Sequence, residues 1–447
     1  MMNIRDRQIL RIALPSIVSN ITVPLLGMID VAIVGHMGSA AYIGAVAVGS
    51  MIFNLVYWLF GFLRMGTSGL TSQALGRRDL AEVVRLLMRS VAIALGTALL
   101  IIVLQGPLKW VMFRLIEPTA DVAPIAATYF NIVVWGAPAM LGLYSLSGWY
   151  IGMQNTRVPM VISIGQNIVN IIASLSLVYG LGMKVEGVAL GTVVAQYAGL
   201  LVATAFFLRY YRRLLIYLTV GATSSPQPSG FLSVFASVFQ RAELVKFFRI
   251  NRDIFLRTLC LVAVNLFFTS AGARQGAVIL SVNTVLLQLY LFFSYFMDGF
   301  AYAGEALGGR SYGARNMTAF NETLRRLFGW MTLVTVVYTL FYIFGGRWIV
   351  GILTDEPQVI EASGHYIWWA CLIPAAGAVA FIWDGIFIGL TATRGMLVSS
   401  FVSALVFFTV YWSTSGWLGN HGLWLAQVVY LLMRGVVQTV WFRQRVL

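Results

Sequence analysis

The stretch GWYIGMQNTR at residues 148–157 returns in altered form as GIFIGLTATR at residues 385–394. The two stretches are 237 residues apart (385 − 148), and the same offset carries Arg78 onto Arg315. Several matches at one period indicate an internal repeat. The chain is therefore predicted to contain two copies of one structural unit.

The composition of the chain is that of a membrane protein. Hydrophobic residues make up 59% of its 447 residues and charged residues 10%, and the mean hydropathy is +0.84, which excludes a soluble globular domain. Apolar runs long enough to cross about 30 Å of hydrocarbon are continuous rather than alternating, so they predict helices and not barrel strands. The predicted fold is all-α, with twelve transmembrane helices whose cores lie at residues 14–34, 45–72, 90–108, 124–150, 159–180, 187–208, 254–280, 284–309, 327–345, 365–389, 396–415 and 423–440.

Each half of the repeat holds six predicted spans. Six is an even number, so both halves enter the membrane in the same direction and form a parallel repeat, an arrangement in which transporters bind substrate between the halves. We predict an N-terminal six-helix lobe at residues 1–208, a cytoplasmic linker at 209–252 and a C-terminal six-helix lobe at 253–447. Within the linker, residues 232–249 predict either an interfacial amphipathic helix or a solvated connector.

The net charge of +14 (30 − 16) gathers in alternate breaks between the spans. The breaks on the opposite side of the membrane contain only four basic residues: Lys109, Arg114, Lys184 and Arg347. This bias predicts that the basic breaks and both termini are cytoplasmic, which requires an even number of spans. The charge is a topology signal, so we expect membrane lipids and no nucleic acid as partners.

Four of the sixteen acidic residues lie well inside predicted spans: Asp30, Asp298, Glu305 and Asp384. A charge at bilayer depth costs roughly 2.5–3.5 kcal/mol on insertion scales, so such a residue is expected to face a cavity and to have a function. Asp298 and Glu305 are seven residues apart and share a helix face. Asp384 directly precedes the repeated stretch, where the first half has Ser147.

Asp30 is the strongest of these candidates for proton coupling. It follows Pro24 and Gly27, which together predict a bend in the first helix. A carboxylate on a bendable helix would exchange one environment for another and so gain or lose its proton. The alternative is a structural acid that caps a neighbouring helix or pairs with Arg64 or Arg274.

Polar residues form a stripe on each of two neighbouring spans. Spacings of three and four residues place them on one face of each helix: Asn167, Asn170 and Ser174 on the fifth span, and Thr192 and Gln196 on the sixth. Such stripes make interhelical hydrogen bonds or line a cavity. Together they predict a polar cavity in the N-terminal half that faces Asp30.

Arg64 and Arg274 also fall in predicted spans. Each would counter a buried acid or meet an anionic group, and the alternative is a structural ion pair or a side chain that reaches the interface. The two cysteines, Cys260 and Cys371, lack metal-site spacing. We expect no cofactor or metal beyond a coupling ion, H⁺ or alternatively Na⁺.

Several of these stretches resemble the multidrug and toxic compound extrusion (MATE) family, and within it the DNA-damage-inducible protein F branch. The resemblance covers nearly the whole chain. It rests on NITVPLLGMID at 20–30, Gly35-His36, FLRM at 62–65, GLTSQA at 69–74, NRD at 251–253, DGFAYA at 298–303, YGAR at 312–315 and DGIFIG at 384–389.

The resemblance implies a cation-coupled antiporter with two six-helix lobes that form a V. Asp30 matches the proton-coupling acid of the family, and Asn170 matches its hydrogen-bonding partner on the fifth span. Ser174 stands where a second acid would be, which favours a single-acid proton switch over a two-carboxylate or sodium mechanism. Asp384 matches a cation-site acid of the C-terminal lobe in some branches.

We therefore expect a monomeric exporter of small amphipathic or organic-cation compounds in the bacterial inner membrane, driven by protons. The alternatives are a sodium-coupled antiporter and a lipid or glycolipid flippase of the same superfamily. An intramembrane enzyme would need a histidine, serine or metal constellation at membrane depth. The chain offers none, since its three histidines lie near span ends: His36, His365 and His421.

Overall fold

A computed structural model of the chain describes residues 3–35, 39–220 and 237–445. All regular secondary structure within these ranges is helical, which confirms the predicted all-α class. The side chains of the predicted bend at Pro24 and Gly27, and the predicted amphipathic stretch up to residue 236, lie outside the described part of the chain.

The first half of the chain begins with α1 (Ile4–Gly35) and continues with α2 (Ala40–Leu59), α3 (Phe62–Gly76), α4 (Leu80–Val103), α5 (Gln105–Ile116), α6 (Ala123–Val133), α7 (Ala137–Gly152), α8 (Arg157–Leu175), α9 (Val185–Tyr210) and α10 (Ile216–Val220). The second half contains α12 (Arg241–Ala273), α13 (Ala277–Ala303), α14 (Gly309–Gly313), α15 (Met317–Leu353), α16 (Pro357–Gly389), α17 (Thr393–Leu418) and α18 (Asn420–Arg445). Two π-helical turns follow α8 and α13: η2 (Ser176–Gly180) and η4 (Gly304–Gly308).

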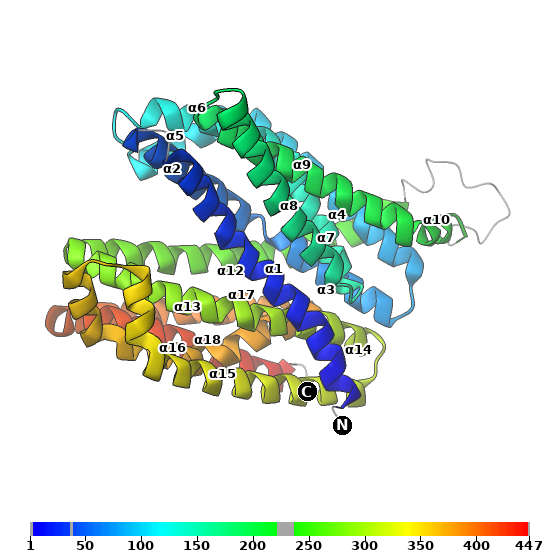
Figure 1. Cartoon of the computed structure of the whole chain (residues 1–447). Coiled ribbons are helices and arrows are strands. Elements are labelled where there is room, and N and C mark those ends of the chain that lie inside the picture. Colours follow the sequence, from blue (N-terminus) through cyan, green and yellow to red (C-terminus); the bar gives the residue numbers. More distant parts are fainter. Residues whose placement is uncertain (1–2, 36–38, 221–236, 446–447) are drawn as a thin grey trace. The chain divides into compact units, whose positions relative to one another are not determined.

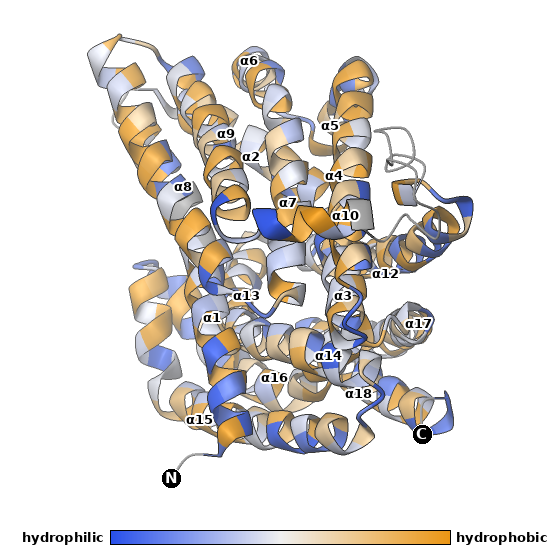
Figure 2. Cartoon of the chain, turned by 90° about the vertical axis from the view of Figure 1, so that its right-hand side faces the viewer, coloured by the Kyte–Doolittle hydropathy of each residue, from blue (hydrophilic) through white to orange (hydrophobic). Residues whose placement is uncertain are grey.

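Eleven segments of the described residues are long and apolar enough to cross a membrane, with α2–α3, α6–α7 and α13–α14 each forming one segment. α1, with 32 residues, is also long enough to cross a bilayer. Hydrophobic residues recur along these helices, as Figure 2 shows. α5 is an addition to the predicted elements, and its 12 residues are too few to span the bilayer.

Contacts divide the chain into an N-terminal unit (Val18–Phe248) and a C-terminal unit (Met1–Ile17 together with Arg249–Leu447). Each dividing point falls inside a helix, one in α1 and the other in α12. The start of α1 thus packs with the second half of the chain, although the sequence-based boundary assigns it to the first lobe.

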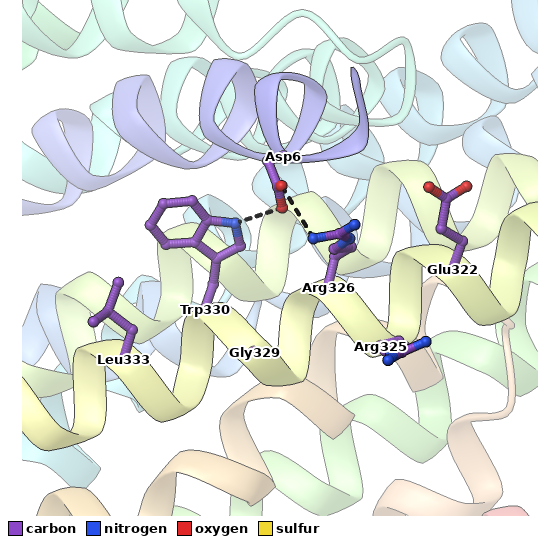
Figure 3. Close-up of a pocket in the computed structure, with 7 residues that line it drawn as sticks. All are labelled: Asp6, Glu322, Arg325, Arg326, Gly329, Trp330 and Leu333. Atoms are coloured by element: carbon purple, nitrogen blue, oxygen red, sulfur yellow. Dashed lines mark hydrogen bonds and ion pairs between the residues drawn. The ribbon is translucent and has the colours of Figure 1, made fainter. Parts of the chain in front are cut away.

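Asp6 fastens the start of α1 to α15 (Figure 3). Its Oδ1 accepts a hydrogen bond of 3.0 Å from Trp330 Nε1, and its Oδ2 lies 3.4 Å from Arg326 Nη1. Arg5, the residue before Asp6, has its Nε atom 3.2 Å from Oε2 of Glu322, which lies one turn before Arg326 on α15. These contacts explain why the first residues of α1 belong to the C-terminal unit, and they border a pocket of about 520 Å³.

The turns of the two halves repeat in atomic detail. Asp79 caps α4 by accepting a hydrogen bond from Glu82 N at 3.0 Å, and Asn316 caps α15 by accepting one from Ala319 N at 2.9 Å. Asp79 and Asn316 are 237 residues apart (316 − 79). The residue before each cap has a left-handed backbone, with φ of 59° in the first half and 54° in the second. The internal repeat is therefore confirmed.

Glycines explain why the quoted stretches are similar. A Cβ atom on Gly148 of α7 would lie 2.3 Å from the backbone oxygen of Arg64 on α3. A Cβ atom on Gly385 of α16 would lie 2.1 Å from the backbone oxygen of Ala301 on α13. Both helix pairs touch backbone to backbone, as small residues allow in membranes, so neither position accepts a side chain.

α16 forms the core of the C-terminal unit. Within its most apolar window 83% of the residues are buried, compared with 11% for α15. α16 packs against α13, α15 and α18. It is the central helix of this unit, whereas the apolar surface of α15 is available to lipid.

Candidate functional site

Asp30 lies near the end of α1 and is buried, with 4% of its surface exposed. Its Oδ1 atom accepts no hydrogen bond from the part of the chain that the structure describes. Tyr129 of α6 is close enough to interact with it electrostatically. The predicted burial of this acid inside the N-terminal half is confirmed.

The polar stripe of α8 connects α1 with α9. Asn167 Nδ2 donates a hydrogen bond of 2.7 Å to the backbone oxygen of Thr22 on α1. Asn170 Nδ2 donates one of 3.2 Å to Thr192 Oγ1 on α9. The hydroxyl groups of Thr22 and Ser163 lie 2.9 Å apart. The two asparagines therefore connect α8 with α1, which carries the acid, and with α9.

Tyr129 joins this network and was not among the residues expected from the sequence. Its hydroxyl group lies 3.4 Å from Ser50 Oγ on α2, and it also interacts with Thr192. A Cβ atom on Gly49 would lie 2.2 Å from the ring, so this glycine makes room for it. A single tyrosine in an apolar span forms no periodic polar pattern, so the sequence contains no signal at Tyr129 itself. Gly49, whose lack of a side chain leaves space for a ring, was the one indirect sign.

Ser174 and Gln196 occupy tight contacts between helices. A Cβ atom on Gly191 would lie 2.2 Å from Ser174 Oγ, and one on Gly136 would lie 1.8 Å from Gln196 Oε1. Both polar side chains are buried. They pack against glycines of the N-terminal unit, and a part in substrate binding stays a prediction for each.

In the C-terminal unit, Asp384 is held by three side chains. Arg257 Nη2 and Arg434 Nη2 both donate to Asp384 Oδ2, the latter at 2.6 Å, and Gln438 Nε2 donates to Oδ1 at 2.6 Å. α12 contributes Arg257, α16 the acid, and α18 the other two residues. All four residues are buried. Because two guanidinium groups neutralise the carboxylate, Asp384 is poorly suited to bind a free cation.

Arg257 and Arg434 are residues that the sequence reasoning missed. Both fall inside predicted spans, at 254–280 and 423–440. The criterion that singled out buried acids applies equally to buried bases. Applied to all charged residues, it would have named both arginines, although not their shared partner.

Among the remaining candidates, Asp298 interacts electrostatically with Arg434 of the Asp384 cluster. Asp298 is half-buried on α13, and Glu305 is fully buried in the π-helical turn η4, a feature frequent at functional sites. Arg64 is half-buried on α3. The placement of Arg274 inside an apolar span is wrong, because α12 ends at Ala273 and Arg274 is exposed in the turn before Gly276, whose φ is 110°.

Comparison with known proteins identifies the family. A family model described as MatE matches residues 15–176 and 254–412. The chain belongs to the MatE family. The two matched ranges fall in the two halves of the internal repeat.

MATE relatives cover the chain almost completely. The chain is 36% identical over 439 residues to the DNA damage-inducible protein F of Escherichia coli, a match that covers 98% of this chain and 92% of the relative. It is 23% identical to the probable multidrug resistance protein NorM of Thermotoga maritima, covering 98% of this chain and 92% of that one. A crystal structure of MATE in the bent conformation matches with a TM-score of 0.85 at 18% identity, covering 99% and 96% of the two chains.

The resemblance drawn from the sequence is thus confirmed. The protein is a MATE multidrug efflux transporter, a multi-pass membrane protein that binds small molecules and is not an enzyme. The structural match shows the fold, and the roles of single residues depend on the geometry of this chain.

Proposed function

We propose that the protein exports small amphipathic compounds in exchange for protons, with Asp30 as the proton-coupling carboxylate. The observation that carries the proposal is the burial of Asp30 near the hydroxyl group of Tyr129, with no basic side chain bonded to it among the described residues. Burying a charged carboxylate without a counter-charge is costly, so the proton occupancy of Asp30 depends on what surrounds it.

The neighbouring groups can serve both forms of the acid. A protonated Asp30 donates a hydrogen bond, whereas the carboxylate only accepts. The hydroxyl group of Tyr129 can do either, which suits a residue beside a proton carrier. If substrate binding changes the surroundings of Asp30, linkage requires proton binding to change substrate affinity by the same factor.

Two features support protons over sodium as the coupling ion. Ser174 supplies a hydroxyl group on α8 where a two-acid site would have a second carboxylate. In the C-terminal unit, Asp384 is bonded to two arginines. A sodium-coupled antiporter would have to displace these guanidinium groups.

We also propose that the transporter works as a monomer in the bacterial inner membrane, with both termini in the cytoplasm. The start of α1 and the end of α18 lie at the same end of the C-terminal unit (Figure 1), which fits an even number of spans. α18 ends in Arg443 and Arg445, as expected for a cytoplasmic end.

A lipid or glycolipid flippase remains the alternative function. Arg257 and Arg434 favour it, because an anionic headgroup needs basic partners at membrane depth. Transbilayer movement of labelled phospholipid by purified protein, measured beside drug export in the same liposomes, separates the two activities.

The test of the main proposal uses purified protein in liposomes. A pH gradient imposed without sodium should drive substrate export by the unchanged protein, and Asp30→Asn should abolish it. The matched control is Asp121→Asn, which makes the same change at an exposed acid. Undiminished export by Asp30→Asn, or export that requires a sodium gradient, would overturn the proposal.

A further inference from the structure

The carboxylate of Asp384 accepts hydrogen bonds from two buried arginines. Within hydrogen-bonding distance, two guanidinium groups face one carboxylate. Asp298 on α13 also interacts electrostatically with Arg434, but more weakly than Asp384 does. One guanidinium group would have sufficed to pair with Asp384, and burying a second one adds a desolvation cost.

The two arginines also have hydrogen-bond donors to spare. A guanidinium group has five N–H donors in a planar fork, and Asp384 takes one nitrogen from each arginine. The Nε atoms of Arg257 and Arg434 are buried and have no acceptor within the described residues. Both arginines are more than nine-tenths buried. Unused buried donors of this kind fit a ligand that brings several acceptor oxygens.

The cluster is not sealed inside the unit. The side chains of Asp384 and Arg257 are 10% and 8% exposed, whereas that of Arg434 is 4% exposed. Arg257 and the acid therefore form the accessible edge of the cluster. Arg434 lies behind them, with its guanidinium carbon 5.7 Å from the ring centre of Tyr430.

We propose that Arg257, Arg434 and Asp384 form an oxyanion-recognition subsite that binds the carboxylate or phosphate group of the transported amphiphile. The proposal rests on the proposed transport function and names a substrate class that differs from the expected organic cations. Arginine suits this role because its fork binds the two oxygens of a carboxylate or phosphate in parallel.

Asp384 then serves as an internal competitor for the same donors. An incoming oxyanion takes N–H groups of Arg257 at the accessible edge, while Asp384 keeps Arg434 and Gln438. When the ligand leaves, the acid again satisfies both arginines. This arrangement lowers affinity and so favours release, which an exporter needs.

The test compares four fluorescent probes that differ only in their head group: pyrenebutyrate, pyrenebutyl phosphate, pyrenebutanol and pyrenebutylamine. Binding to the purified full-length protein is measured at equilibrium in nanodiscs of zwitterionic lipid, without any gradient. We expect one or both oxyanions to bind about tenfold tighter than the alcohol, the factor that one charge-assisted hydrogen bond supplies, and the amine to bind no tighter than the alcohol.

The same substitution changes probe affinity in opposite directions for an oxyanion site and for a cation site. Asp384→Asn should tighten oxyanion binding about threefold or more, because it removes the competitor, whereas a cation site would lose affinity for the amine. Arg257→Gln should reduce oxyanion binding to the level of the alcohol. Arg249→Gln, on the exposed surface of the same helix, is the control and should change nothing.

Equal binding of all four probes, or tighter binding of the amine, overturns the proposal even if no variant folds. Weaker oxyanion binding by Asp384→Asn also overturns it. Competition by anionic lipid added to the nanodiscs supports the subsite and assigns it to a lipid headgroup. Since no gradient is applied, failure here leaves proton coupling through Asp30 standing, and that part is tested separately by Asp30→Asn.

Discussion

Replacing Gly385 by alanine tests whether backbone contact between α16 and α13 sets the packing of the C-terminal unit. The new Cβ atom would lie 2.1 Å from the backbone oxygen of Ala301. An ordinary carbon–oxygen contact needs about 1 Å more, so the helices must separate. Such overpacking typically costs about 1–3 kcal/mol, and the better helix propensity of alanine returns about 1 kcal/mol of it. We expect a net loss of up to about 2 kcal/mol.

Gly364 provides the matched control on the same helix. A Cβ atom there meets nothing within 4 Å. Gly364→Ala should therefore keep the stability or raise it by up to about 1 kcal/mol through helix propensity. Gly148→Ala, the repeat counterpart, should behave like Gly385→Ala, since its Cβ would lie 2.3 Å from a backbone oxygen.

The assay is the apparent melting temperature of the purified protein in detergent, followed by size-exclusion chromatography at one fixed heating rate because unfolding is expected to be irreversible. The order should be Gly364→Ala at or above the unchanged protein, with both contact variants below it. If Gly385→Ala has the same apparent melting temperature as Gly364→Ala, the close approach of the two backbones does not limit packing. Our explanation of the repeated glycines is then refuted.

Three further predictions follow from single contacts. Asn170→Ala should slow proton-driven export without lowering the amount of folded protein, because it removes the hydrogen bond to Thr192, which interacts with Tyr129, the neighbour of Asp30; unchanged transport at equal protein amounts would contradict this. Asp6→Asn should loosen the start of α1 at a cost of about 0.2–1 kcal/mol, since the contact is partly exposed, and hydrogen exchange of residues 4–12 should accelerate while that of α16 stays constant. Asn316→Ala should lower the melting temperature by removing the cap of α15, worth about 1 kcal/mol; Asn316→Asp, which keeps the capping oxygen, should not.

The two clusters differ in how far the sequence predicted them. Asp30, Asn167 and Asn170 were found because a buried acid and a helical spacing of polar residues are local signals. Tyr129 was not found, since its ring reaches the network from α6 and the residues three and four positions away from it are apolar, so no polar stripe includes it. In the C-terminal half, the sequence identified Asp384 but suggested a cation site. Its arginine partners lie on other helices, so the sequence did not show that two guanidinium groups neutralise it.

The sequence by itself determined the membrane-helix class, the two-fold repeat and the buried acids, because hydropathy, glycine spacing and charge depth are properties of short stretches. Only the tertiary structure decided which charges meet. Arg257 and Arg434 lie 127 and 50 residues from Asp384 along the chain and reach it from α12 and α18. Nothing local to any of these helices records that contact, since it arises when helices distant in sequence pack together. An acid that looks like a cation site in the sequence thus proves to be the partner of two arginines.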